Sequence, residues 1–482
     1  MTTFKHYIAA LWLIGAVAGM TGCAGYAGRV EGMRTALQAG NKKEALKQVN
    51  GAMELGESDH YPVDADSETS LLLMERASIK QASFMFQESA FDFRIADQNL
   101  EFLDVQNKTV GEISKWIFSG DSGEYRAPAH ELLLLNTLNM LNYLALSDLE
   151  SARVEARRFD LMQQYLADGS DEQMRSLGIL GLGDYLAGFT FEMSKRYEQS
   201  LQHYGDALST NEYPSLDKVI PDLAGCTSYR NDVILQKLNN AGAGQNPVPG
   251  DSDVADGQTD STSSSRCIHP DRTTGTLLVV SSVGLVPHKV ATRLPVGAAV
   301  VIAGAYLAPQ EMAQANDFAI KGLLKWVNFA ELAQSPSKFS SVSVRVDGQG
   351  IPSEYGENLS QVVKDSFDKI KGKLIAAAIV RMIARAATGA ITNKAVSGGS
   401  GKEGLGLLAQ VLVEGAMTVA DTPDTRCWNA LPASIFISRM EVPAGKHQVA
   451  VHFQGTGGGE TVTREVSVPS GGFAVVPVHQ LR

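Results

Sequence analysis

The sequence predicts an α+β protein, in which an N-terminal α-helical repeat domain is followed by a C-terminal antiparallel β domain with a helical insertion. Three observations carry this prediction. Apolar residues recur at three and four positions from about residue 27 to 240, as on one face of a helix. β-branched and alternating runs dominate residues 266–482. Residues 241–265 are rich in Gly, Ser, Asp and Pro, which predicts a disordered linker between two domains.

The first residues have the order of a secretory signal. One basic residue, Lys5, precedes an apolar run over residues 7–18, and small and polar residues then lead to Cys23. The apolar run is shorter than the roughly 20 residues that a membrane-spanning helix needs. We therefore expect residues 1–22 to be removed as a signal peptide, so that another feature anchors the chain.

Met20-Thr21-Gly22-Cys23 resembles the lipobox of bacterial lipoproteins, in which a Leu-like residue and two small residues precede an acylated cysteine. The resemblance implies lipidation of Cys23, and two or more acyl chains such as palmitate anchor a protein stably. Ala24, instead of Asp, follows the cysteine, which favours the periplasmic face of the outer membrane. The alternative is an ordinary secreted protein with an incidental cysteine.

The charge argues against nucleic acid as a partner. The chain has a net charge of −11, and loss of residues 1–22 removes one lysine, so the mature charge is −11 − 1 = −12. An acidic chain without a long basic run gains nothing from the neutralisation of phosphates.

The helical half carries a faint internal repeat. Residues 71–103 and 132–166 are each long enough for two helices. Four segments share bulky and small residues at offsets 0, 3, 7 and 10, so that a neighbouring helix can approach the small residue closely. They are Lys42, Ala45, Val49, Ala52; Phe86, Ser89, Phe93, Ala96; Leu149, Ala152, Ala156, Phe159; and Tyr197, Ser200, Tyr204, Ala207.

These four segments resemble the second helix of tetratricopeptide repeats. Their starts lie 44, 63 and 48 residues apart, whereas the regular spacing is about 34 residues. The array is therefore expected to be degenerate or to carry insertions. The alternative is a plain α-helical bundle with chance periodicity.

Seven runs that are rich in β-branched residues, or in which apolar and polar residues alternate, predict the strands of the β domain. They are residues 276–282, 289–294, 340–346, 434–441, 446–454, 461–468 and 473–478. The last four follow one another across short turns, which predicts an antiparallel meander.

A helical insertion near residues 310–420 interrupts these strands. Its expected apolar or amphipathic segments are residues 310–333, 359–390 and 405–420. Residues 374–390 raise the question of a membrane span, but they contain Arg381 and Arg385, and each Arg at a bilayer centre costs about 2.5 kcal/mol or more. We expect a buried or partner-facing helix, and whether residues 374–390 and 405–420 meet the membrane stays open.

Lipidation of Cys23 leaves Cys226, Cys267 and Cys427. An oxidising periplasm permits disulfides, and three thiols allow one pair with one left over. Cys226 and Cys267 bracket the linker, which favours their pairing, while the other two pairings stay open. No Cys-x-x-Cys occurs, which argues against a redox motif and a zinc ribbon.

No catalytic, cofactor-binding or metal-binding motif stands out, so the sequence predicts a protein that is not an enzyme. Residues 398–403 superficially resemble a phosphate loop, but Glu403 replaces its hydroxyl residue and a glycine five residues before Gly401 is missing. His447 and His452 fall on opposite faces of a predicted strand and cannot chelate one metal ion from it. A hydrolase with an unrecognised site is the remaining enzymatic alternative.

Two charged groups, Glu75-Arg76 and Glu155 with Arg157 and Arg158, allow two interpretations. The arginines at 157 and 158 could hold a carboxylate of a partner. Charged pairs on a solvated helix face are commoner. We expect solvated faces and assign no site to either group.

Several stretches carry a wider resemblance. They are residues 141–148 leading into 152–158, Trp428-Asn429-Ala430-Leu431-Pro432, and Pro443-Ala444-Gly445-Lys446-His447. With the lipobox, they resemble a family of poorly characterised tetratricopeptide-like lipoproteins of Gram-negative bacteria. The resemblance implies cellular location and architecture, but no catalytic residues. It also implies that residues 443–445 connect two strands tightly and that Trp428 plugs the side of the β domain.

Together these observations predict a membrane-anchored, non-enzymatic scaffold or adaptor in envelope assembly. Stacked helices offer a concave surface for a peptide of a partner, and the β domain docks a second component. The expected partners are envelope proteins and the membrane, reached through the lipid on Cys23; no cofactor is expected, and homo-oligomer formation stays open. The alternative is a subunit of an envelope export or pore-like oligomeric assembly, in which residues 374–390 and 405–420 lie between subunits or meet the bilayer.

Overall fold

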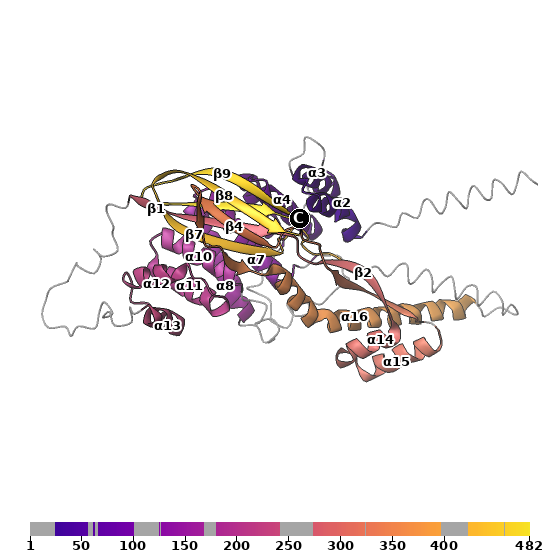
Figure 1. Cartoon of the computed structure of the whole chain (residues 1–482). Coiled ribbons are helices and arrows are strands. Elements are labelled where there is room, and N and C mark those ends of the chain that lie inside the picture. Colours follow the sequence, from indigo (N-terminus) through magenta and orange to yellow (C-terminus); the bar gives the residue numbers. More distant parts are fainter. Residues whose placement is uncertain are drawn as a thin grey trace, which may run out of the picture.

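The computed structural model describes residues 25–55, 61–62, 66–100, 125, 127–167, 180–241, 273–322, 324–396, 423–456 and 458–482. Within these residues the chain is a mixed α+β protein, with most helices in the N-terminal half and the strands in the C-terminal part (Figure 1). This predicted division is confirmed. Cys23, residues 405–420, and the predicted linker beyond residue 241 lie outside the described residues.

Eight helices of the described N-terminal half pack as four consecutive hairpins, which we call the helical array. The pairs are α2 (Tyr26–Gln38) with α3 (Lys42–Ala52), α4 (Ser67–Ala82) with α5 (Phe86–Asn99), α7 (Ala129–Ala145) with α8 (Leu149–Ala167), and α10 (Gly181–Met193) with α11 (Tyr197–Thr210). Two shorter helices, α12 (Leu216–Ala224) and α13 (Asp232–Asn240), contact α11. Residues 71–103 and 132–166 each hold two helices, as predicted.

The two helices of every hairpin are joined by the same turn. One residue of each turn has a left-handed backbone: Gly40 (φ 76°), Phe84 (63°), Ser147 (59°) and Lys195 (59°). Its amide donates to the carbonyl three residues earlier, and the next amide donates to the carbonyl five residues earlier. These bonds satisfy carbonyls that a helix end leaves without partners. The second helix starts two residues later, at the four positions where the predicted segments start.

The predicted offsets mark the buried face of each second helix. The small residues at the second offset are all fully buried: Ala45, Ser89, Ala152 and Ser200. The hydroxyls of Ser89 and Ser200 donate to the carbonyls of Ala77 and Gly188 in the first helix, each at 2.8 Å. A small side chain at this position therefore allows the two helices to approach closely.

The C-terminal part contains ten strands among its described residues. They are β1 (Thr274–Val283), β2 (His288–Pro295), β3 (Trp326–Ala333), β4 (Ser341–Val346), β5 (Gln349–Ile351), β6 (Glu354–Glu357), β7 (Ser434–Pro443), β8 (Gly445–Gly455), β9 (Gly458–Val468) and β10 (Phe473–Gln480). The order β10-β1-β7-β6 forms one sheet, the inner sheet, and β5-β4-β8-β9 forms another, the outer sheet. β2 and β3 form a separate ribbon. All seven predicted strands are present.

The predicted antiparallel meander is wrong. Of its three expected strand pairings only that of β8 with β9 is present; β7 pairs with β1 instead, and β10 runs parallel to β1. The domain is therefore not purely antiparallel. A short turn in the sequence does not reveal whether the next strand stays in its sheet or crosses to the facing one, and the chain crosses after both β7 and β9.

The helical array and the two sheets form three layers (Figure 1). Leu278 and Val280 of β1 belong to the same core as the helices. Leu277 and Val279, on the other face of β1, pack with the outer sheet. Because successive side chains of a strand point to opposite faces, one central strand serves both cores. The helical half and the β part thus share a continuous apolar core.

A third apolar core lies in an arm that projects from the layers (Figure 1). The arm comprises the β2–β3 ribbon with α14 (Val296–Ala303), η3 (Gly304–Tyr306), α15 (Pro309–Ile320) and part of α16 (Leu359–Val396). The predicted helix over residues 310–333 is wrong in its second half, where β3 forms because it pairs along its length with β2. The helix predicted over residues 359–390 is present as α16. Among the described residues, none of the helices combines the length and apolar character needed to cross a bilayer.

Candidate functional site

The cysteines lie in different surroundings. Cys226, just after α12, is disulfide-bonded, whereas Cys427 is free and buried. Burial raises the pKa of Cys427 to about 12, so its thiol stays protonated and is a poor nucleophile. Cys23 and Cys267 are outside the described residues, and lipidation of Cys23 and pairing of Cys226 with Cys267 stay predictions.

The segment from Thr425 to Leu431 enters the helical array. Trp428 is 1% exposed, and its indole nitrogen donates to Oγ of Ser78 at 3.0 Å. Its ring meets the ring of Phe93 edge-on, with the centroids 5.6 Å apart. Trp428 therefore packs between α4 and α5, so the expectation that it plugs the side of the β domain is wrong.

Glu75 of α4 binds the main chain of this segment. Its Oε1 accepts hydrogen bonds from the backbone and side-chain nitrogens of Asn429, at 2.7 and 2.9 Å, and its Oε2 accepts one from the backbone nitrogen of Ala430 at 2.6 Å. The hydroxyl of Tyr26 donates to Oε1 at 3.1 Å. Burial raises the pKa of Glu75 to about 7, although these hydrogen bonds oppose the rise.

Glu131 of α7 completes the arrangement. It accepts hydrogen bonds from the backbone nitrogen of Trp428 at 2.9 Å and from the hydroxyl of Tyr125. Burial raises its pKa as well. Two carboxylates thus receive the N–H groups of three successive residues, 428 to 430, which would be costly to bury without acceptors. This site recognises peptide backbone, and the peptide that occupies it is part of the same chain.

Sequence reasoning missed this site because it placed Glu75 and Arg76 on a solvated helix face. Both are buried, with exposed fractions of 0% and 3%. Glu75 follows the apolar run Leu71-Leu72-Leu73-Met74, and Ala77 and Ile79 come soon after it. That spacing is the signal that could have identified it, since a helix that is apolar on several faces is buried. Glu131 likewise precedes four consecutive leucines.

The second charged group is also less exposed than predicted. Glu155 is 4% exposed and accepts hydrogen bonds from the side-chain amides of Asn136 and Asn139, each at 3.0 Å. Arg158 forms an ion pair with Asp97 at 2.5 Å. Arg157 alone is exposed, as expected. The solvated-face prediction is therefore wrong for Glu155, whose partners come from the preceding helix.

A buried polar contact joins the helices of three hairpins at one common position, six residues after the start of the second helix. Asp92 of α5 pairs with Arg76 of α4 at 2.7 Å. Glu155 occupies this position in α8 and His203 in α11. Nδ1 of His203 lies 3.1 Å from Oδ1 of Asp184 in α10. A charged or polar side chain that is buried without a partner is costly. The pairs therefore favour contact between these helices over packings that would separate the paired side chains.

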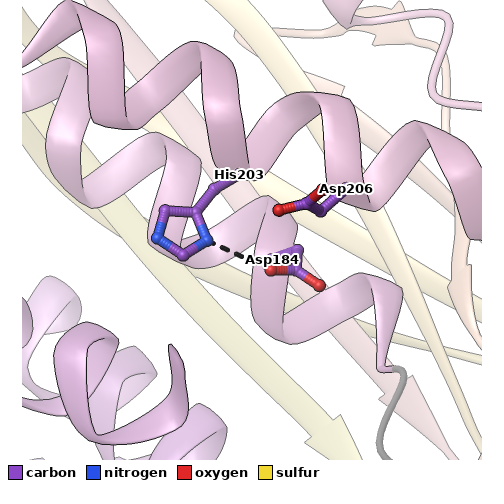
Figure 2. A group of neighbouring side chains, drawn as sticks. All are labelled: Asp184, His203 and Asp206. Carbon is purple, nitrogen blue, oxygen red and sulfur yellow. Dashed lines mark hydrogen bonds and ion pairs between the residues drawn. The ribbon is translucent and has the colours of Figure 1, made fainter. Parts of the chain in front are cut away.

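Asp184 and His203, with Asp206, form the one group of potential metal ligands found among the described residues (Figure 2). One ligand atom from each of the three lies within 4.8 Å of the others. Gln163 of α8 donates to Oδ2 of Asp184 at 2.9 Å. Burial raises the pKa of Asp184, and burial together with the charge of Asp184 raises the pKa of Asp206 to about 6. An imidazole nitrogen and two carboxylates suit a divalent cation such as Zn²⁺.

The geometry of this group is also explained without an ion. The Asp184–His203 pair takes the place that Arg76–Asp92 takes in another hairpin, where the contact serves helix packing. Asp206 is exposed to solvent, and acidic groups at the surface are common without a metal. The group is therefore a structural pair with a neighbouring carboxylate.

Comparison of the chain with models of known protein families, with characterised proteins and with solved structures gave no match. The described residues form a backbone-binding site that the chain itself occupies and a set of buried polar pairs between helices.

Proposed function

We propose that this chain is a lipid-anchored periplasmic protein of the outer membrane that acts as a non-enzymatic scaffold or adaptor in envelope assembly. The observation that carries the proposal is the use of the buried carboxylates. Glu75 and Glu131 bind main-chain N–H groups of residues 428–430 instead of facing a cavity. A catalytic acid or base must reach a substrate, whereas these groups hold two parts of the protein together.

The anchoring part of the proposal rests on the sequence of residues 1–23. A short apolar signal followed by Met20-Thr21-Gly22-Cys23 supports export and lipidation. The net charge of −11 makes nucleic acid an unfavourable partner. Envelope proteins and the membrane, the latter reached through the lipid, remain the expected partners.

We further propose that the helical array is a degenerate tetratricopeptide-like repeat. Four identical turns and four buried small residues at one offset support it. Irregular spacing of the hairpins argues for inserted segments between them. Arrays of this kind commonly bind peptides on their concave surface; here one part of the array is already occupied by residues 425–431, so a partner must use another surface.

The second candidate function is a subunit of an export or pore-like assembly. The exposed face of α14 favours it, because every residue of this helix is apolar and Val301 is 83% exposed. Ile320, at the end of α15, is 87% exposed. Apolar surface of this kind is usually covered in an assembly, and neighbouring subunits of a ring would cover it.

Cross-linking in intact cells separates the two candidates. Capture of other envelope proteins by the native chain, lost in the Cys23→Ala variant, supports a membrane-anchored scaffold. Recovery of this chain alone, in large rings that persist in Cys23→Ala, rejects the scaffold and favours the pore-like assembly. Val301→Asp in the same experiment should dissolve such rings and leave scaffold contacts intact.

A further inference from the structure

In the inner sheet, the edge of β7 that faces away from β1 is only partly paired with another strand. β7 pairs with β1 along residues 434–443, but on its other side β6 pairs only with residues 435–437. From Ser438 to Pro443, no described strand is hydrogen-bonded to the edge of β7 that faces away from β1. Backbone groups of such an edge form a template for another strand. We call this stretch the open edge.

The chain itself does not extend β6 along the open edge. β6 starts at Glu354, and Pro352 lies two residues before it. Proline has no backbone N–H and cannot donate to a neighbouring strand. The hydroxyls of Ser353 and Ser438 lie 2.8 Å apart and close this end. Pro443 bounds the other end, so the open edge has a defined length.

The open edge faces a pocket with a volume of about 1310 Å³. Arg439, Met440 and Glu441 of β7 line one side, and Asp217, Val219 and Asp222 of α12 line the opposite side. Pockets of this volume are large enough for several residues of an extended peptide. A strand bound here would have the β7 backbone on one side and the α12 side chains on the other.

The lining of the pocket is acidic. It contains five carboxylates against the two cations Lys218 and Arg439, and the carboxylates are Glu212, Asp217, Asp222, Glu354 and Glu441. Arg439 is already engaged, because its Nη2 lies 2.5 Å from Oε1 of Glu192 and its Nη1 donates to the hydroxyl of Tyr204 at 3.0 Å. Asp217 is paired with Lys237 at 2.7 Å, so four carboxylates face the single cation Lys218. A negative lining attracts a positively charged partner.

We propose that this pocket binds an extended segment of a partner protein that carries basic side chains and that adds to β7 as a strand. The proposal rests on the scaffold function proposed above and gives that function a surface and a partner chemistry. Main-chain hydrogen bonds to the open edge supply the attachment, and the carboxylates select lysine and arginine at alternate positions, since every second side chain of a strand points to the same face.

The test uses the full Cys23→Ala chain and a fluorescein-labelled peptide, Thr-Lys-Val-Lys-Val-Thr, with binding followed by fluorescence anisotropy. Two matched peptides accompany it, one with Glu in place of Lys and one with alternate amides N-methylated. The basic peptide should bind, and both matched peptides should bind more weakly by about tenfold or more, because one loses charge complementarity and the other loses backbone donors.

Two charge-reversed variants assign the site. Asp222→Lys and Glu212→Lys change exposed lining residues and should each weaken the basic peptide severalfold. Glu150→Lys, an equally exposed residue on α8, should leave binding unchanged. Equal binding of the N-methylated peptide, or equal effects of all three variants, would overturn strand addition at this pocket.

Failure of this inference is distinguishable from failure of the scaffold function. If the peptide does not bind but cells still yield Cys23-dependent capture of envelope proteins, the scaffold stands and the pocket is not its contact surface. If Asp222→Lys instead abolishes self-association of the unlipidated chain, a second copy occupies the open edge and the proposal of a basic partner is wrong.

Discussion

The rings of Trp428 and Phe93 meet edge to face, with their centroids 5.6 Å apart, although one residue belongs to the β part and the other to the helical array. Their contact shows that the segment before β7 is a structural part of the array. A residue so deeply buried contributes both apolar transfer energy and packing.

Trp428→Ala should therefore destabilise the protein severely. We expect the free energy of unfolding to fall by about 3–5 kcal/mol, because the change leaves a large cavity between α4 and α5. Urea unfolding followed by circular dichroism measures it. Trp326→Ala is the matched control, since Trp326 is 46% exposed and should cost much less. Similar losses of stability in both variants would mean that burial of the Trp428 side chain does not hold residues 425–431 in the helical array.

Glu75 should make the stability depend on pH. Its pKa is about 7 in the folded protein, against 4.5 as the ordinary value, so the folded state binds the proton more tightly than the unfolded state. The free energy of unfolding should therefore fall as pH rises from about 4.5 to about 7 and level off above that range.

Glu75→Gln is the variant that isolates this contribution. It removes the titration, so the difference between its stability and that of the native protein should change across the same pH range. Gln presents an amide where a backbone N–H needs an acceptor, so we also expect a general loss of about 1–3 kcal/mol. A pH profile parallel to that of the native protein would exclude Glu75 as the titrating group.

Lys195→Gly should stabilise the protein. Lys195 has a φ of 59° in the turn between α10 and α11, a conformation that costs a residue with a side chain about 1–2 kcal/mol and costs glycine almost nothing. Allowing for the greater freedom of glycine in the unfolded chain, we expect a gain of up to about 1 kcal/mol.

The control for this change is Lys47→Gly, at an exposed position inside α3. It should lower stability by about 1 kcal/mol, because glycine is a poor helix former. The urea midpoint should rise in Lys195→Gly and fall in Lys47→Gly. This result would support the turn that joins the two helices of each hairpin. A loss in Lys195→Gly would contradict the left-handed conformation at this position.

Removal of divalent cations should leave the thermal melting temperature unchanged. The contact between Asp184 and His203 is explained by hairpin packing, and Asp206 adds only a like charge. Asp206→Asn should therefore be neutral or slightly stabilising in differential scanning calorimetry. A drop in melting temperature with EDTA that Zn²⁺ restores, and that Asp206→Asn abolishes, would assign a metal centre to this group.

Much of the local structure could be predicted from the sequence, because it depends on periodicity. The positions Ala45, Ser89, Ala152 and Ser200 were predicted as close-packing residues, and all four are buried. The predicted strand around residues 434–441 is β7. Each of these predictions concerns a pattern within one helix or strand, where side-chain spacing determines which face is buried.

The remaining features depend on contacts between distant parts of the chain. Glu75 binds Asn429 and Ala430, and nothing within the sequence around Glu75 identifies these partners. The parallel pairing of β10 with β1 likewise depends on which sheet the last described strand joins. The partial coverage of β7 is a consequence of where β6 begins, and a strand of four residues carries too little periodicity to be recognised.

The position of β1 between β7 and β10 has a consequence for biogenesis. Both neighbours lie far downstream, from residues 434 and 473 onward. Contacts of such high sequence separation slow folding. Until they form, the apolar strand Thr274–Val283 remains available to other chains, which is an aggregation hazard. We therefore expect the newly made chain to need a holding chaperone until β10 has paired with β1.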